Sequence, residues 1–252
     1  GTMAVSIKSA REIELMREAG KRLAHVHQEL EAMIAPGIST WEIDAKGEKL
    51  IRDCGCIPNF LHYNGYPASI CVSVNDEVVH GIPRKDRYLK EGDIVSLDAG
   101  LIYKGYHSDA ARTHAVGKVS TEAQKLMDVT KQSFFEGIKM AKEGQHLHDI
   151  SRAIEEYVTP YGYGIVRDLV GHGIGTALHE DPQIPNYAQK RRGVRLQAGM
   201  TLAIEPMINA GTWQVRFLRD GWTVVTKDGS LSAHYENTIL VTDGEPEILT
   251  LY

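Results

Sequence analysis

Two aspartates lie on either side of a tight turn in the segment LDAGLIYKGYHSDAAR, which spans residues 97–112. The turn is centred near Lys104, and Asp98 and Asp109 lie on its two arms. If the segment is a hairpin, Asp98 lies opposite Asp109 to within about one residue, and opposite residues share a face of the sheet. Facing carboxylates repel each other by roughly 0.2–1 kcal/mol, so a cation or a proton should accompany them.

Three side chains from later in the chain can complete a metal site. Glu205 follows the apolar run MTLAI, Glu236 precedes TILVT, and His172 lies in GHGIG. With Asp98 and Asp109 they make four carboxylates and one imidazole, too much negative charge to bury without compensation. Two divalent cations would balance it, and these donors suit Mn, Fe(II), Co or Zn. Such a pair of ions activates a water for hydrolysis of an amide or a phosphoester.

Each residue also has an ordinary explanation when it is taken alone. An Asp on a strand is usually the solvated flank of a turn, and a His among glycines can belong to a turn. Glu205 precedes Pro206 and can simply end a strand at the surface. The conjunction favours the metal site, because Glu205 and Glu236 adjoin apolar runs where a bare carboxylate would meet the core.

Two further histidines have candidate roles. His80 in VHGI holds the place in the first half that His172 holds in the second, so we expect it to approach the same centre without binding metal. His179 follows His172 by seven residues and can hydrogen-bond a developing oxyanion. The others are interpreted as ordinary helix, loop or strand residues: His25, His27, His62, His107, His114, His146, His148 and His234.

The elements that must position this cluster are predicted from caps and periodicity. Ser9 and Ser39 each precede a Glu by three residues, which is a capping-box pattern. The apolar spacing predicts helices from Ser9 to the APG segment, from Ser39 to Gly55, from Ser120 or Thr121 to about Lys142, and from His146 to Pro160. Strands are predicted at SICVSV, DIVSLDAGLIY and YHSDAARTHAVG, and again after the last helix.

The two halves of the chain resemble each other. VHGI at 79–82 matches GHGI at 171–174, and EGDIVSLD at 91–98 matches AGMTLAIE at 198–205. HSDAA with Asp109 parallels AHYENT with Glu236. The pattern predicts an internally duplicated α+β fold with repeats at about 9–118 and 120–250, in which helices cover one face of a curved antiparallel sheet. The carboxylates would then meet at a pseudo-twofold axis.

Composition limits the classes of function. The 252 residues are 42% hydrophobic and 24% charged, and no apolar run approaches the roughly 20 residues that span a bilayer. Three cysteines cannot build a disulfide framework, which favours a reducing cytoplasm. The net charge of −5 provides no basic field for nucleic acid, so we expect neither DNA nor a membrane as a partner. Residues 1–3, GTM, are interpreted as a cloning remnant followed by the initiator Met3.

Six motifs together resemble those of type I bacterial methionine aminopeptidases. They are HGIP at 80–83, SLDAG at 96–100, YHSDAART at 106–113, GHGIGTALHE at 171–180, LAIEPM at 202–207 and SAHYENTILVT at 232–242. The similarity covers essentially residues 6–249. It implies a pita-bread fold forming one catalytic metallopeptidase domain over 4–252, two divalent cations, and removal of the initiator methionine from nascent polypeptides with a small second residue.

The resemblance also implies roles for individual residues. The family's five ligand positions are occupied by Asp98, Asp109, His172, Glu205 and Glu236. Glu205 also matches the residue that takes a proton from a water bridging the two metals, His80 one that contacts the scissile region, and His179 one that supports the tetrahedral intermediate. The family's methionine pocket corresponds to Tyr63, Tyr66, Cys71 and Trp222, with Phe60 and Leu178 at rim positions where other members often carry a cysteine or an aromatic residue.

Other functions are known on the same fold. An Xaa-Pro aminopeptidase or prolidase shares the fold but generally carries an extra amino-terminal domain, whereas here the catalytic motifs begin at once. A binding module on the same fold, or a metal-free amidinohydrolase, should have lost ligands, and all five positions here carry metal-competent side chains. We expect a monomer. Transient ribosome association would suit the activity, although the acidic composition shows no evident RNA-binding patch.

Overall fold

A computed structural model describes residues 5–252, and the expected cloning remnant and Met3 lie outside the described residues. These residues contain four α-helices: α1 (Ala10–Ala32), α2 (Thr40–Asp53), α3 (Thr121–Ile138) and α4 (Leu147–Val158). Short 3-10 turns occur at η1 (Tyr63–Gly65) and η2 (Thr159–Tyr161). Within residues 5–252 no helix is long and apolar enough to span a bilayer.

The predicted helix starts are confirmed. Ser9 and Ser39 accept hydrogen bonds from the backbone N–H groups of Glu12 and Glu42, whose carboxylates accept from the cap N–H groups in return. The predicted end of α3 near Lys142 is wrong, because the helix stops at Ile138. Beyond that residue the backbone tightens into i to i+3 turns, in which the N–H of Met140 donates to Gly137 O.

Fifteen strands form four sheets, and all recorded strand pairings within 5–252 are antiparallel. The first half contributes β1 (Ile57–Pro58), β2 (Ile70–Val74), β3 (Glu77–Val79), β4 (Ile94–Tyr103) and β5 (Tyr106–Ala115). The second half contributes β6 (Gly164–Ile165), β7 (Gly171–Gly173), β8 (Glu180–Ile184), β9 (Thr201–Ile204), β10 (Met207–Asn209), β11 (Val215–Phe217), β12 (Val224–Thr226), β13 (Ser232–His234), β14 (Asn237–Leu240) and β15 (Glu247–Ile248).

The hairpin of β4 and β5 forms as predicted, but its register differs by two residues. Asp98 pairs with Ala111, and Asp109 pairs with Gly100. The turn contains only Lys104 and Gly105, whose φ angles of 47° and 86° suit a two-residue hairpin turn. An offset of two preserves the side-chain alternation, so Asp98 and Asp109 still share one face.

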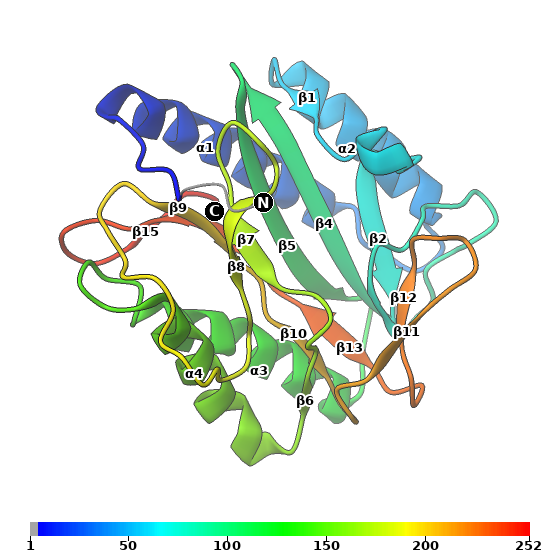
Figure 1. Ribbon diagram of the computed structural model, residues 1–252. Coiled ribbons are helices and arrows are strands. Elements are labelled where there is room, and N and C mark those ends of the chain that lie inside the picture. Colours follow the sequence, from blue (N-terminus) through cyan, green and yellow to red (C-terminus); the bar gives the residue numbers. More distant parts are fainter. Residues whose placement is uncertain (1–4) are drawn as a thin grey trace.

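Each half packs its own helices on its own strands. In Figure 1, α1 and α2 run across the upper part and α3 and α4 lie below, with the strands between them. Helix α1 contacts β4 and β5, α2 contacts β2, and α3 contacts β10 and β13. The two largest apolar clusters lie one in each half, mainly from residues 19–116 and mainly from residues 123–241, and two smaller clusters combine residues of both halves.

The halves are joined where β5 approaches the segment between β13 and β14. Ala111 and Glu236 exchange backbone hydrogen bonds of 3.1 and 2.9 Å. The buried guanidinium of Arg112 donates to the carbonyl oxygens of Glu236 and Thr250 and to Asn237 Oδ1. This junction places Glu236, from the second half, beside β5, the strand of the first half that carries Asp109.

Candidate active site

Four of the five predicted metal ligands converge on one point. Asp109, His172, Glu205 and Glu236 each offer a donor atom, and these atoms all lie within 4.8 Å of one another. His172 Nε2 lies 3.4 Å from Glu205 Oε2, 3.8 Å from Asp109 Oδ2 and 3.9 Å from Glu236 Oε2. They come from β5, from β7, from the residue after β9 and from the residue before β14.

The fifth predicted ligand, Asp98, belongs to an adjacent group. Asp98, Glu236 and His234 offer donor atoms that lie within 4.8 Å of one another. Glu236 is therefore common to both groups. The structure brings all five predicted ligands together, and it adds His234, which the sequence pattern treats as an ordinary strand residue.

The glycines on both sides of His172 allow β7 to pass closely between β8 and β9. A Cβ at Gly171 would lie 2.4 Å from the carbonyl oxygen of Ala203, and one at Gly173 would lie 2.3 Å from that of Asp181. The His172 ring is oriented by its Nδ1, which donates to Gly173 O at 2.9 Å. Its Nε2 faces the carboxylates and is thereby left free to bind a metal ion.

The carboxylates are buried without partners, which is the feature that best fits cations. Glu236 is 0% exposed, and neither of its carboxylate oxygens has a hydrogen-bond partner. Asp98 Oδ1, Asp109 Oδ1 and Glu205 Oε2 are also buried and unpartnered. Buried polar atoms normally find partners, so a set of unpaired oxygens around one imidazole indicates that divalent cations bind here.

The pKa shifts in the cluster also indicate that positive charge would stabilise these carboxylates. Burial, together with the charge of Asp109, raises the pKa values of Asp98 and Glu236 well above those of ordinary carboxyls. Burial opposes the charge on His172, but Asp109 and Glu205 outweigh it and raise its pKa to about 10. Without cations the chain would have to hold protons at this site.

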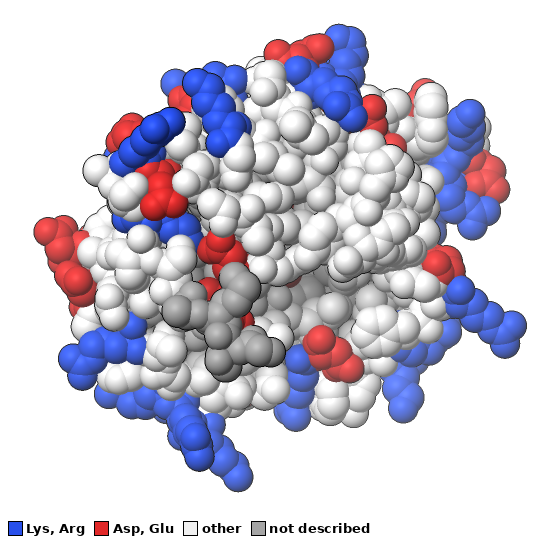
Figure 2. Space-filling model, turned by 45° about the horizontal axis from the view of Figure 1, so that its top comes forward, with Lys and Arg blue, Asp and Glu red and all other residues white. Residues whose placement is uncertain are grey.

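A cavity of about 210 Å³ opens over the metal cluster and is lined by every other predicted site residue. Its polar end includes His80, Asp98, Asp109, His172, His179 and Glu205, and its wall includes Phe60, Tyr63, Tyr66, Cys71, Leu178 and Trp222. Figure 2 shows one face of the molecule, where a hollow adjoins a broad area without charged side chains. Basic and acidic side chains are interspersed around the outer edge of this face.

The two non-ligand histidines differ in what holds them. The ring centroid of His179 lies 4.3 Å from that of His172, and its Nδ1 lies 2.9 Å from the hydroxyl of Tyr63. Burial lowers the pKa values of His80 and His179, which favours neutral imidazoles at pH 7. His80 has a left-handed φ of 60°, a backbone strain of the kind that collects at functional sites.

The cavity wall is aromatic and apolar. Tyr66 and Trp222 make an edge contact with ring centroids 5.1 Å apart, and the Tyr66 hydroxyl donates to the carbonyl oxygens of Ile70 and Gly81. Cys71 is 5% exposed, and burial raises the pKa of its thiol to about 12, so it is a neutral wall group. The wall therefore suits an apolar side chain.

Sequence reasoning missed three residues of the site. Asn64 also lines the cavity, and its position in an Asn-Gly pair was a turn signal. His234 Nε2 lies 3.9 Å from Glu205 Oε1, and its spacing of two residues from Glu236 was a signal that both could share a face. Arg112 reaches Glu236 through its backbone carbonyl, for which the sequence carries no signal. None of the eight histidines interpreted as ordinary lines this cavity, and His234 alone among them offers a donor atom to the two metal groups.

Comparison with known proteins decides the family. The model of metallopeptidase family M24 matches residues 14–243. The chain belongs to metallopeptidase family M24. The match spans both halves of the duplicated fold, including the two groups of metal donors.

Two relatives within M24 are similar to this chain over almost its whole length. A methionine aminopeptidase from Clostridium acetobutylicum is 54% identical over 98% of this chain and 99% of the relative. The crystal structure of a methionine aminopeptidase from Thermotoga maritima superposes with a TM-score of 0.96 and 47% identity, covering 98% of this chain and 100% of that one. The resemblance inferred from the motifs is thus confirmed.

More distant structures share the fold alone. A prolidase from Pyrococcus furiosus has a TM-score of 0.75 and 23% identity, and the match covers 98% of this M24 chain but 65% of the prolidase. The expected pita-bread architecture is confirmed by these neighbours.

Proposed function

We propose that this M24 chain is a methionine aminopeptidase, which hydrolyses the first peptide bond of polypeptides that begin with methionine and prefers a small second residue. One observation carries the proposal: the cluster of unpartnered carboxylates around His172 forms the floor of a 210 Å³ cavity whose wall is aromatic and apolar. The names of the close relatives support the same activity.

The metal site holds divalent cations through Asp98, Asp109, His172, Glu205 and Glu236. When bound, such ions lower the pKa of a coordinated water and polarise the scissile carbonyl. We further propose two ions per chain, because the donors form two groups that share Glu236. Mn, Fe(II), Co and Zn all suit these ligands, and availability decides among them.

Glu205 is the group that accepts a proton from the attacking water. Burial opposes its ionisation, but the neighbouring imidazole of His172 favours the carboxylate form and lowers the pKa of Glu205. Its Oε2 is buried and has no hydrogen-bond partner, which leaves a free acceptor beside the cavity. A positioned carboxylate of this kind contributes about 10²–10⁴-fold as a general base.

His179 and His80 stabilise the developing oxyanion and orient the scissile bond. When the Tyr63 hydroxyl donates to His179 Nδ1, the neutral ring carries its proton on Nε2 and can donate it to an oxyanion. His80 lines the same cavity and is packed against Trp222, with ring centroids 6.5 Å apart. Neutral donors suit this role because burial keeps both rings uncharged.

The methionine side chain binds between Tyr66, Cys71 and Trp222. Its flexible thioether gains roughly 0.3–1.5 kcal/mol from each sulfur–aromatic contact. Phe60 and Leu178 are 8% and 3% exposed and limit the space beside the pocket. A crowded cavity favours a small second residue in the substrate.

The cellular setting belongs to the same proposal. We place the enzyme in the cytoplasm as a monomer that acts on nascent chains, with transient ribosome contact. Three free cysteines suit a reducing compartment. Light scattering on the purified chain tests the monomer, which has a mass of 28.0 kDa.

The direct test compares two peptides on chelator-stripped protein with Mn, Fe(II), Co or Zn restored in turn. We expect release of methionine from Met-Ala-Ser and no cleavage of Ala-Pro-Ala. The reverse preference would assign the chain to the proline-directed rival. Glu205→Gln keeps the side-chain volume, so we expect kcat to fall at least about 10²-fold with unchanged circular dichroism. Undiminished turnover by that variant would remove Glu205 from the mechanism.

A further inference from the structure

His234 lies beside the metal cluster with one ring nitrogen unused. The residue is 1% exposed, and its Nε2 is buried with no hydrogen-bond partner. Sequestering an imidazole nitrogen in this way is costly unless something pairs with it. The unpaired atom therefore requires an explanation.

The neighbourhood of this nitrogen offers carboxylates at metal-binding spacing. A ring nitrogen of His234 lies within 4.8 Å of donor atoms of Asp98 and Glu236. Glu205 Oε1 is 3.9 Å from His234 Nε2, which is too far for a hydrogen bond. A cation between these side chains would pair the nitrogen and the unpartnered oxygens of Asp98 and Glu236 together.

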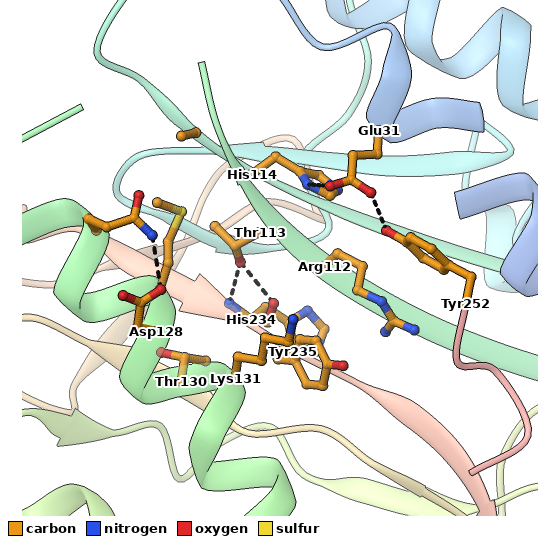
Figure 3. A pocket seen from close by; sticks show the side chains of 13 residues that line it. Glu31, Arg112, Thr113, His114, Asp128, Thr130, Lys131, His234, Tyr235 and Tyr252 are labelled. Carbon is orange, nitrogen blue, oxygen red and sulfur yellow. Dashed lines mark hydrogen bonds and ion pairs between the residues drawn. The ribbon is translucent and has the colours of Figure 1, made fainter. Parts of the chain in front are cut away.

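The backbone holds His234 in this place. Thr113 Oγ1 donates to the carbonyl oxygen of His234 at 2.8 Å and accepts from its N–H at 2.9 Å. Figure 3 shows these two bonds at the edge of a second cavity of about 270 Å³, on which Glu31, His114 and Tyr252 also border. Since Thr113 belongs to β5, the strand that carries Asp109 also fixes the position of His234.

We propose that His234 is a sixth protein ligand of the metal centre and that its Nε2 coordinates the cation held by Asp98 and Glu236. This inference rests on the proposed function only in so far as that function requires two metal ions. Each group of donors then contains one imidazole, His172 in the first and His234 in the second, and Glu236 belongs to both groups.

An added imidazole has a consequence for metal preference. Nitrogen donors favour Co and Zn, whereas a site built from carboxylates alone favours Mn and Mg. The second ion should therefore be bound more tightly as Co(II) than as Mn(II). Removing the imidazole should reduce the difference in affinity between Co(II) and Mn(II) at this position.

The test uses His234→Gln, with His27→Gln as the matched control. His27 is also a fully buried histidine, but it donates to Ala110 O and borders neither donor group. Each chelator-stripped protein is titrated calorimetrically with Co(II) and with Mn(II). We expect His234→Gln to bind the first Co(II) normally and the second at least about tenfold more weakly, with a smaller loss for Mn(II). The control should bind both ions as the unaltered chain does.

X-ray absorption gives a readout that does not depend on a variant. With two equivalents of Co(II), the unaltered chain should show an average of one imidazole per ion, and His234→Gln half of that. Equal second-ion affinity in the two proteins, or an average of half an imidazole in the unaltered chain, would overturn the proposal and leave His234 as a neighbour of Glu205. Neither readout depends on peptide cleavage, so failure of the proposed function would be recognised separately, by an unaltered, fully loaded chain that releases no methionine.

Discussion

The two halves of the duplicated chain contribute acids in equivalent places but by different local structures. In the first half, Asp98 and Asp109 lie inside the two ten-residue strands of a regular hairpin. In the second half, Glu205 follows the end of β9 and Glu236 precedes the start of β14. The first half thus provides a rigid frame, and the second provides groups at strand ends, where longer side chains can reach inward.

The histidines of the two halves also lie in different local structures. His80, in the first half, lies in a strained left-handed conformation after β3, whereas His172, in the second, lies in a strand between two glycines. The second half also supplies His179 and His234. Duplication has therefore given two similar scaffolds, of which the second carries most of the nitrogen donors and the shared carboxylate.

The largest effect should come from the carboxylate that both groups share. Glu236→Gln removes a charge from each group, so we expect loss of tight binding of both ions and a fall of at least about 10³-fold in kcat/KM. Asp98→Asn, the matched change in the first half, should weaken mainly the second ion. Metal analysis after dialysis measures the difference. Equal losses in the two variants would contradict the division of the donors into two groups.

The next effect concerns the junction between the halves. Arg112 is 6% exposed and donates to two carbonyl oxygens and an amide oxygen of the second half. Arg112→Met should lower the free energy of unfolding by about 3 kcal/mol or more, because buried acceptors lose their donor. Chemical denaturation measures this, with the exposed Arg52→Met as a control expected to change it by no more than about 0.5 kcal/mol. A similar loss in both variants would show that Arg112 does not join the halves.

The sequence predicts elements better than it predicts contacts between the halves. The helix starts follow from Ser-x-x-Glu patterns, which are local, and the ligands follow from residue type and internal similarity. The hairpin register was wrong because it depends on whether Tyr103 belongs to the turn or to the strand. The role of Arg112 depends on the contact of β5 with a distant segment, for which local sequence carries no signal. For His234 the spacing from Glu236 indicated a shared face, but its approach to the metal donors depends on the same contact with β5.

A third prediction concerns a buried histidine of the first half that lies outside the metal site. His27 is fully buried and donates to Ala110 O at 2.7 Å, and burial followed by the charge of Arg112 lowers its pKa to about 3. Since the unfolded chain takes up this proton near pH 6.5, His27 stabilises the fold above that pH. This contribution is lost as the pH falls from 6.5 towards 3.

His27→Gln keeps a donor for Ala110 but cannot titrate. Its unfolding free energy should fall less steeply between pH 6.5 and 4.5, by up to about 1.4 kcal/mol per pH unit. Denaturant melts of metal-stripped protein across this range measure the slope. Parallel slopes in the two proteins would mean that acid sensitivity arises in the second half or at the metal cluster, and not at His27.

The smallest effect should come from the cavity rim, where the halves meet around the substrate. Leu178, from the second half, is 3% exposed and lines the cavity together with Phe60 from the first half. Leu178→Ala frees space beside the second residue of the substrate, so the ratio of kcat/KM for Met-Val-Ser to that for Met-Ala-Ser should rise roughly threefold to tenfold. Ile174→Ala removes bulk from the same apolar cluster without lining the cavity, and it should leave the ratio unchanged. If both variants shift the ratio alike, the effect comes from general loosening of the cluster. A shift confined to Leu178→Ala would assign part of the second-residue preference to the half that also supplies most of the nitrogen donors.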